Sequence, residues 1–143
     1  MPRIVACRRE HLDAVLELVA DSDLPAEGLP EHLRSVWVAQ AGTEIVGAVG
    51  LERHGPVALL RSLVVREDRR RGGLGAALVR RALREARRMG VSEVVLLTAG
   101  AADFFRGCGF ERVDEACIPE DVRGSPGFRA SGGRPAQCMR LAL

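Results

Sequence analysis

The 143-residue chain contains no lysine, no asparagine and no tyrosine, and arginine supplies all 21 of its basic side chains. The absence of lysine excludes the nucleotide-binding loops that require a Gly-Lys-Ser/Thr sequence. The absence of tyrosine excludes a phenolic hydroxyl as a proton donor in catalysis. A GC-rich coding bias is the simplest explanation for this use of arginine.

Long apolar segments are also missing. No run approaches the roughly 18–20 residues of a membrane span, and the opening residues MPRIVACRREH lack the apolar core of a signal peptide. Apolar residues make up 47% of the chain and the net charge is +2, which predicts a folded, soluble protein. We expect a single domain over residues 1–143, a cytoplasmic location and no membrane partner.

Paired cysteine motifs are absent as well. The four cysteines show no Cys-x-x-Cys spacing and the three histidines do not cluster, so we expect no metal site. Buried, reduced thiols are the simpler interpretation. Thiolates distant in sequence can still meet in a fold, so binding of a soft metalloid by Cys108, Cys117 or Cys138 stays open.

Hydrophobic periodicity predicts strands that alternate with helices. A strand around Val5 is followed by a helix over 10–19 and a loop rich in proline and glycine. The strands expected after that loop are 35–40, 44–53, 57–65, 91–98, 110–115 and 137–143. Helices are expected over 74–89 and 99–107, and the first of them connects two parallel strands. A long ordered excursion is expected over 117–135.

A glycine-rich turn, Gly72-Gly73-Leu74-Gly75, separates the strand at 57–65 from the helix at 74–89. Such turns commonly hold phosphate groups, because free N–H groups of the turn and of the helix N-terminus face the anion. The dinucleotide fingerprint requires a third glycine where this chain has Leu78, so it does not fit.

A different phosphate-binding design fits the turn. Arg70-x-x-Gly73-x-Gly75, within SLVVREDRRRGGLGAALV, resembles the acetyl-CoA pyrophosphate loop of the GCN5-related N-acetyltransferase (GNAT) superfamily. Further along, AADFFRGCGF resembles the closing signature of the same superfamily. The resemblance runs from Ile4 to about Val113. It implies an α/β (α+β) fold whose central mixed sheet, of about six to seven strands, splays apart in the middle and is flanked by helices.

The resemblance implies acetyl-CoA as co-substrate, and it gives the backbone of β-strand residues a role. Leu63, Val64 and Val65 are expected beside the pantetheine arm, with an N–H near Val64 polarising the thioester carbonyl. Members often have Arg-Gly where this chain has Arg70-Arg71, so we expect a rearranged turn there. The other expected cofactor contacts are Arg70, Arg71, Gly72, Gly73, Leu74, Gly75, Ala76 and Phe105.

Attack by an amine requires a base or a chain of water molecules. Glu52 stands where members often carry a glutamate that activates water, and a solvated strand end is the alternative interpretation. His54, in the following turn, is a second candidate. Glu27 lies in the loop that we expect over the acceptor site, where it could bind the amine.

The general acid that is usual in the superfamily is a tyrosine at the position of Phe105, which this chain lacks. Water or Cys108 is therefore expected to protonate the departing thiolate of CoA. Thr98 stands where many relatives have asparagine, and it would orient such a water.

A narrower resemblance involves residues 59–65, residues 96–110 and the C-terminal tail. LLRSLVV, LLTAGAADFFRGCGF and the tail PEDVRGSPGF…AQCMRL are similar to the N-acetyltransferases of arsenic-resistance operons, which resemble the catalytic domain of N-acetylglutamate synthase. Arg61, with the neighbouring Ser62, is interpreted as a clamp for an acceptor carboxylate, because an arginine inside an apolar strand is costly to bury alone. An outward-facing, solvated Arg61 is the alternative.

The resulting prediction is an enzyme that acetylates the amine of a small, amino-acid-like or arsenic-containing molecule, with homodimerisation through C-terminal strands as an implied partner. An acetyl-CoA sensor without turnover and a thiolate-based arsenite binder are the other hypotheses. A nucleic-acid partner is not expected, because 19 acidic residues offset the arginines and aromatic residues are few.

Overall fold

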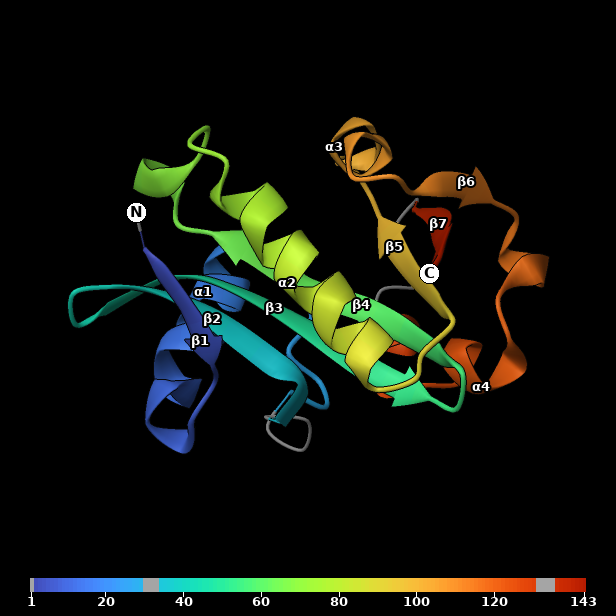
Figure 1. The fold of residues 1–143 in the computed structure, drawn as a ribbon, viewed down its shortest axis with the longest axis horizontal. Coiled ribbons are helices and arrows are strands. Elements are labelled where there is room, and N and C mark those ends of the chain that lie inside the picture. Colours follow the sequence, from blue (N-terminus) through green and yellow to red (C-terminus); the bar gives the residue numbers. More distant parts are fainter. Residues whose placement is uncertain (1, 30–33, 131–135) are drawn as a thin grey trace.

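A mixed sheet of seven strands, in the order β1-β2-β3-β4-β5-β7-β6, forms the centre of the protein in the computed structural model (Figure 1). The structure describes residues 2–29, 34–130 and 136–143, and the numbers of strands and helices refer to these ranges. The strands are β1 Arg3–Ala6, β2 Val36–Ala41, β3 Glu44–His54, β4 Val57–Val65, β5 Glu93–Thr98, β6 Glu111–Val113 and β7 Gln137–Ala142. This confirms the predicted fold class.

Five α-helices and three short 3-10 turns accompany the sheet in the described part of the chain. The helices are α1 Leu12–Asp21, α2 Leu74–Arg88, α3 Ala102–Gly107, α4 Glu120–Arg123 and α5 Pro126–Ala130. The 3-10 turns are η1 Arg9–His11, η3 Glu67–Arg69 and η4 Glu115–Cys117. None of these described helices is long and apolar enough to cross a bilayer.

The strands pair as their patterns predict. β1 to β4 form an antiparallel meander, whose β2–β3 turn uses Gly42 at a φ of +64°. Helix α2 then crosses the sheet and delivers β5 parallel to β4. Gly90, with a φ of +81°, follows the last turn of α2, as glycine does at many helix C-termini.

β4 and β5 separate in the middle of the sheet. They pair only over Val57–Leu59 and Glu93–Val95, although β4 continues to Val65 and β5 to Thr98. Past Leu59, β4 keeps its ladder with β3 alone. The predicted splaying is therefore confirmed, and it leaves the side of β4 that faces β5 without a neighbouring strand.

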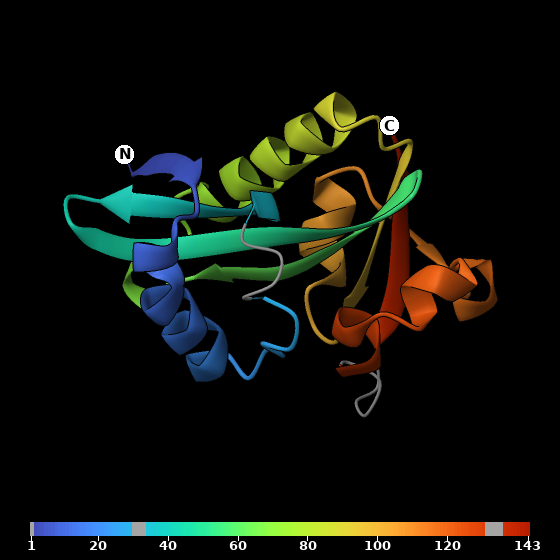
Figure 2. The ribbon, with the colours of Figure 1, turned by 90° about the horizontal axis from the view of Figure 1, so that it is seen from below.

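The two faces of the sheet carry different hydrophobic clusters. We call them the α2 face and the α1 face (Figure 2). On the α2 face, Leu78, Ala82 and Ala86 of α2 pack with alternate residues of the strands and with Phe105 and Phe110. On the α1 face, one cluster surrounds α1 and a second surrounds α4 and α5. Because strand side chains alternate, neighbouring residues of β3 and β4 serve opposite faces.

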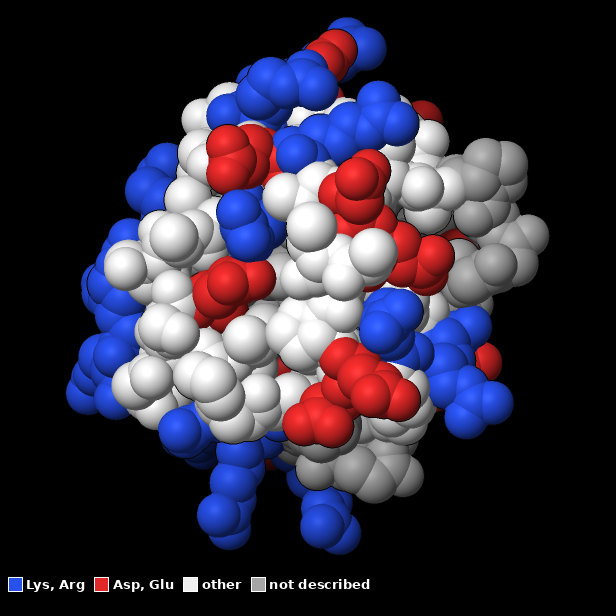
Figure 3. Space-filling model, turned by 90° about the vertical axis from the view of Figure 1, so that its right-hand side faces the viewer, with Lys and Arg blue, Asp and Glu red and all other residues white. Residues whose placement is uncertain are grey.

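An ordered excursion was expected over 117–135, of which residues 131–135 lie outside the described residues. Its described part contains short helices that the glycines and prolines concealed. Val122 of α4 and Phe128 of α5 are buried against β4, β5 and β7. Burial of these apolar side chains, rather than local helix propensity, stabilises such short helices. On the surface seen in Figure 3, acidic and basic side chains are interspersed.

Packing of α2 on the sheet should depend on a glycine in β3. A Cβ at Gly47 would lie 3.1 Å from both Leu78 Cδ1 and the Val64 carbonyl oxygen. We expect Gly47→Ala to cost about 1–3 kcal/mol, because the backbone of β4 cannot retreat. Adding Leu78→Val should recover part of the loss. Gly100→Ala, which has open space around it, is the control, and urea denaturation gives the values.

Candidate functional site

The glycine turn forms the N-terminus of α2. Gly73 is the N-cap with a φ of +82°, and the first bond across the turn runs from Ala77 N–H to the Gly73 carbonyl. The N–H groups of Leu74, Gly75 and Ala76 therefore have no partner inside the helix. Three aligned donors at the positive end of a helix of 15 residues suit a bound anion.

The arginines before the turn hold its shape. Arg70 donates from Nε to the Val65 carbonyl at 2.9 Å, which ties the turn to the end of β4. Arg71 has a φ of +69°, in the left-handed region that favours glycine. Arg71 thus takes a backbone conformation that glycine would adopt readily, at the position where members of the superfamily often have glycine. Gly72 is exposed, with little around it.

β4 contains a bulge beside the splayed region. Ala48 pairs with Val64 and Gly50 with Arg61, so β4 has one residue more than β3 between these pairs. Ser62 within the bulge has a φ of +58°. A bulge redirects the backbone, and here it precedes Leu63, Val64 and Val65, whose β5 side is open. An extended amide chain could pair with this open edge as an added strand does.

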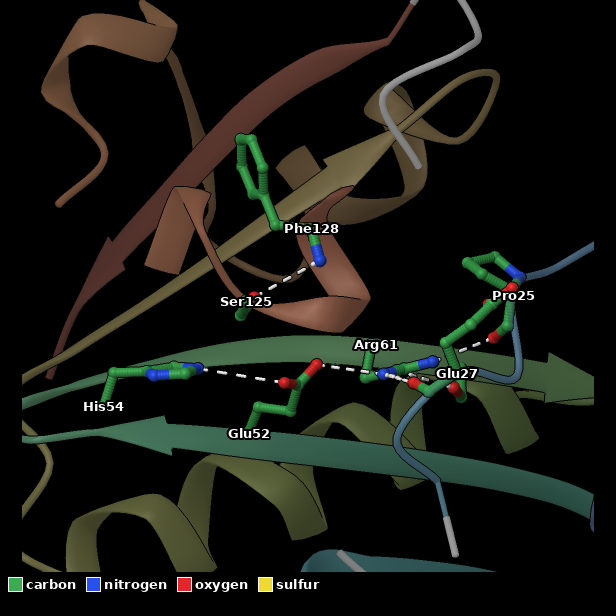
Figure 4. Close-up of polar contacts among 8 residues, drawn as sticks. Pro25, Glu27, Glu52, His54, Arg61, Ser125 and Phe128 are labelled. Atoms are coloured by element: carbon green, nitrogen blue, oxygen red, sulfur yellow. Dashed lines mark hydrogen bonds and ion pairs between the residues drawn. The ribbon is translucent and has the colours of Figure 1, made fainter. Parts of the chain in front are cut away.

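The α1 face carries a buried ion pair, shown in Figure 4. Arg61 Nη1 donates to Glu52 Oε2 at 2.9 Å, and the two side chains are 7% and 1% exposed. Arg61 also donates from Nη2 to the Pro25 carbonyl at 3.0 Å, from Nε to Ser62 Oγ at 3.2 Å, and from Nη1 to the Glu27 carbonyl. A buried arginine needs partners of this kind.

A solvated strand end for Glu52 and an outward-facing, solvated Arg61 were the alternative interpretations from the sequence. Both are wrong, because Glu52 and Arg61 are buried. The simple carboxylate clamp also needs correction. Four hydrogen bonds within the described residues use four of the five guanidinium N–H groups. A two-pronged pair between Arg61 and an acceptor would therefore have to displace protein groups.

Gly127 of α5 lies directly on this ion pair. A Cβ at that position would collide with Glu52 Oε2 and lie 2.8 Å from Arg61 Nη1. Gly127 is buried, in a helix that the sequence did not predict. Three distant segments thus meet at the pair: the loop at Pro25 and Glu27, the strands β3 and β4, and α5 (Figure 4).

Glu52 lies some distance along β3 from the position opposite Val64. Ala48, opposite Val64, is four residues from Glu52, or about 13 Å along β3. An amine beside Val64 would therefore reach Glu52 only through water. On the other side, His54 Nε2 is 3.8 Å from Glu52 Oε1, and both atoms are buried with no hydrogen bond to any described residue. His54 lies two residues beyond Glu52 on β3, so it is farther than Glu52 from the bulge.

The two adjacent phenylalanines of the closing signature lie in different environments. Phe105 is buried on the α2 face, 5.1 Å from the ring of Phe104 and 5.8 Å from that of Phe110. Phe104 is 38% exposed, and its Cζ would lie 3.3 Å from a Cβ at Gly75. Phe104 therefore borders the glycine turn. The sequence analysis missed this, because Phe104 and Gly75 are about thirty residues apart in the chain and only the fold brings them together.

The remaining predicted residues lie on the α2 side of the splay. Thr98 Oγ1 accepts a hydrogen bond from Ala101 N–H at 3.0 Å, and Thr98 lines a hollow of about 260 Å³ with Arg106 and Arg112. Cys108 packs against the α2-face cluster. Burial raises the pKa of the Cys108 thiol, so it is protonated at neutral pH and has a proton to donate.

The thiols are not grouped for metal binding. Burial also raises the pKa values of Cys7 and Cys138, which disfavours the thiolate form that a soft metalloid binds. Within the described ranges, no group of three His, Cys, Asp or Glu residues is placed to hold a metal ion. Of the four cysteines, only Cys117 is exposed, and all four are free.

Comparison with known proteins gives one consistent result. A family model described as an acetyltransferase (GNAT) domain matches residues 32–112. N-acetyltransferase family 8 member 3 of Rattus norvegicus is 35% identical over 104 residues, which cover 66% of this chain and 46% of the relative. The uncharacterized N-acetyltransferase CT2212 of Chlorobaculum tepidum is 30% identical over 97 residues, covering 67% and 62%. The chain thus spans roughly half of these relatives.

Solved structures show the same fold over nearly the whole chain. N-acetylglutamate synthase from Neisseria gonorrhoeae, complexed with coenzyme A and N-acetyl-glutamate, has a TM-score of 0.86 at 19% identity, covering all of this chain and 35% of that one. Rv2747 from Mycobacterium tuberculosis, a complex with CoA, has a TM-score of 0.85 at 22% identity and covers 99% of each chain.

The ion pair should be a strongly coupled unit. Arg61→Met alone leaves the Glu52 carboxylate buried without its cation, so we expect a loss of about 3–5 kcal/mol in unfolding free energy. Arg61→Met combined with Glu52→Gln should lose less than the single variant, because no charge is then left unpaired. Guanidinium denaturation of the wild type, both single variants and the double variant measures the coupling. Additive losses would show that the pair is not coupled.

Proposed function

Because the chain belongs to the acetyltransferase (GNAT) domain family, we propose that residues 1–143 form one domain that transfers the acetyl group of acetyl-CoA to the amine of a small, amino-acid-like acceptor. The observation that carries this proposal is the open edge of β4 next to the glycine turn. The glycine turn offers N–H donors to a diphosphate, and the open edge of β4 offers backbone groups to a thioester.

The residues around the glycine turn and the open edge of β4 fit acetyl-CoA. Leu74, Gly75 and Ala76 supply free N–H groups, and exposed guanidinium groups at Arg70 and Arg71 add positive charge. Gly75 has no side chain to block the approach, and Phe104 offers an apolar wall beside it. The proposed partners of the pantetheine amides are the backbone groups of Leu63, Val64 and Val65. The buried ring of Phe105 packs against the ring of Phe104.

The proposed reaction needs little covalent chemistry from side chains. The amine nitrogen attacks the thioester carbonyl carbon, the carbon–sulfur bond breaks, and the proton that the amine loses ends on the CoA sulfur. A backbone N–H near Val64 would stabilise the negative oxygen of the tetrahedral state. Holding both substrates at the bulge supplies the rest of the rate.

Proton movement is assigned to groups on both sides of the splay. Glu52 would receive the amine's proton through water, given the distance of about 13 Å along the strand. Cys108 or a water held by Thr98 would return a proton to sulfur. The position of Phe105 has no hydroxyl, so the leaving thiolate depends on these groups.

The acceptor class is inferred from a protein of the same fold. The structure of N-acetylglutamate synthase holds N-acetyl-glutamate beside coenzyme A, which favours a small molecule with a carboxylate for this chain as well. An arsenic-containing amino acid analogue is included in this class on the strength of the C-terminal resemblance. Within the described residues, no three His, Cys, Asp or Glu side chains are grouped to hold a metal ion, which argues against arsenite binding as the main activity.

Release of free CoA thiol tests the function. The protein is incubated with acetyl-CoA and a panel of amino acids, their amides, polyamines and arsenical analogues. We expect acceptor-dependent thiol release with the amino-acid group. Tight acetyl-CoA binding without release for any amine would instead support a sensor, and failure to bind acetyl-CoA at all would overturn the assignment.

The glycine turn offers a matched pair of variants for the cofactor site. Gly73 and Gly90 lie at opposite ends of α2 with φ values of +82° and +81°, and neither would meet an atom within 4 Å of an added Cβ. Valine strains both positions alike, by about 1–3 kcal/mol. We expect Gly73→Val to weaken acetyl-CoA binding at least about tenfold, since it crowds the anion site. Gly90→Val should leave the affinity unchanged, as calorimetry would show.

A further inference from the structure

A hollow of about 440 Å³ lies on the α1 face and is lined by Glu27, Gly124, Pro126 and Arg129. The loop residue and the α5 residues are separated by about a hundred positions in the sequence, yet they border the same space. The hollow adjoins the buried ion pair, since the Glu27 carbonyl accepts a bond from Arg61 and Gly127 of α5 contacts Arg61 and Glu52.

The hollow carries one charge of each sign. Glu27 and Arg129 are exposed. Within the described residues, neither side chain has an ion pair or a hydrogen bond, although eight other ion pairs occur in the protein. Opposite charges that border one open space, without pairing with other side chains, are suited to a ligand that itself carries both charges.

Arg129 is better placed than Arg61 to bind an incoming carboxylate. Four of the five N–H groups of Arg61 already donate to protein oxygens, and its side chain is 7% exposed. The guanidinium of Arg129 has no such bonds to described residues and stands in solvent. A two-pronged contact with a carboxylate requires two free N–H groups on one edge, which only Arg129 of these two offers.

We propose that Glu27 and Arg129 form the specificity subsite for a zwitterionic amino acid: Arg129 binds the acceptor carboxylate, and Glu27 holds its ammonium group before a proton is lost. This proposal rests on the proposed acetyltransferase function and refines it. The buried Glu52–Arg61 pair contacts both α5 and the loop that carries Glu27. It therefore fixes the position of α5, and with it Arg129, relative to that loop.

The test compares Arg129→Gln with Arg123→Gln. Arg123 is an exposed arginine of the neighbouring helix α4 that does not line the hollow, so its variant removes the same charge elsewhere. The rate of CoA release is measured for the best amino acid of the panel and for its amide, which lacks the carboxylate. We expect Arg129→Gln to lower kcat/KM for the free acid about tenfold or more, mainly through KM.

Three further readouts separate recognition from a structural effect. The ratio of free acid to amide should fall toward one in Arg129→Gln, stay at the wild-type value in Arg123→Gln, and recover only partly in Arg129→Lys. Glu27→Gln should raise KM for the free acid and the amide alike, since both carry the ammonium group. Added salt should raise KM for the free acid in the wild type, because the hollow is open to solvent. An unchanged acid-to-amide ratio in Arg129→Gln would overturn the proposal.

Direct binding keeps the subsite testable if the enzyme function fails. If the wild type releases no CoA with any amine, the proposed function is wrong, and NMR titration with the amino acids and their amides judges the subsite alone. Shifts at Glu27 and α5 that depend on the carboxylate and vanish in Arg129→Gln would support it. The absence of binding by every amino acid would overturn it.

Discussion

The separation of β4 from β5 after three residue pairs governs the arrangement of the protein. Continuous pairing would satisfy every backbone group of both strands and leave a closed sheet. Because pairing ends at Leu59 and Val95, one edge of β4 is open in the middle of the domain. The α2 face supplies the glycine turn at one end of that edge. The α1 face supplies the ion pair and the charged hollow, so the two halves of the site approach the splay from opposite faces.

Much of this arrangement could be predicted from the sequence, because it depends on local patterns. Periodicity identified α1, α2 and the strands, and the Gly73 and Gly75 spacing identified the turn at the start of α2. The short helices α4 and α5 could not be predicted, since burial of Val122 and Phe128 by distant strands stabilises them. Arg71 was also beyond local reasoning, because an arginine with a φ of +69° contradicts the usual preference of its residue type.

The site shows the same division. Glu52, Arg61 and Glu27 were candidates from the sequence, but their partners were not. The contact of Arg61 with the Pro25 and Glu27 carbonyls, and the position of Gly127 on the pair, depend on how separate segments meet. Sequence reasoning treated Arg61 as either exposed or waiting for a ligand. The structure shows a third state, in which the protein itself satisfies most of the guanidinium.

The position of Gly127 has a consequence for the order of folding. The ion pair beneath it joins β3 to β4, two strands linked by a short turn that can pair early. The segment that covers it is α5, which begins more than sixty residues after Arg61 in the chain. Until α5 docks, the side of the pair that Gly127 covers is open. During synthesis the part proposed to bind the cofactor can thus take shape before the part proposed to bind the acceptor, which includes α5.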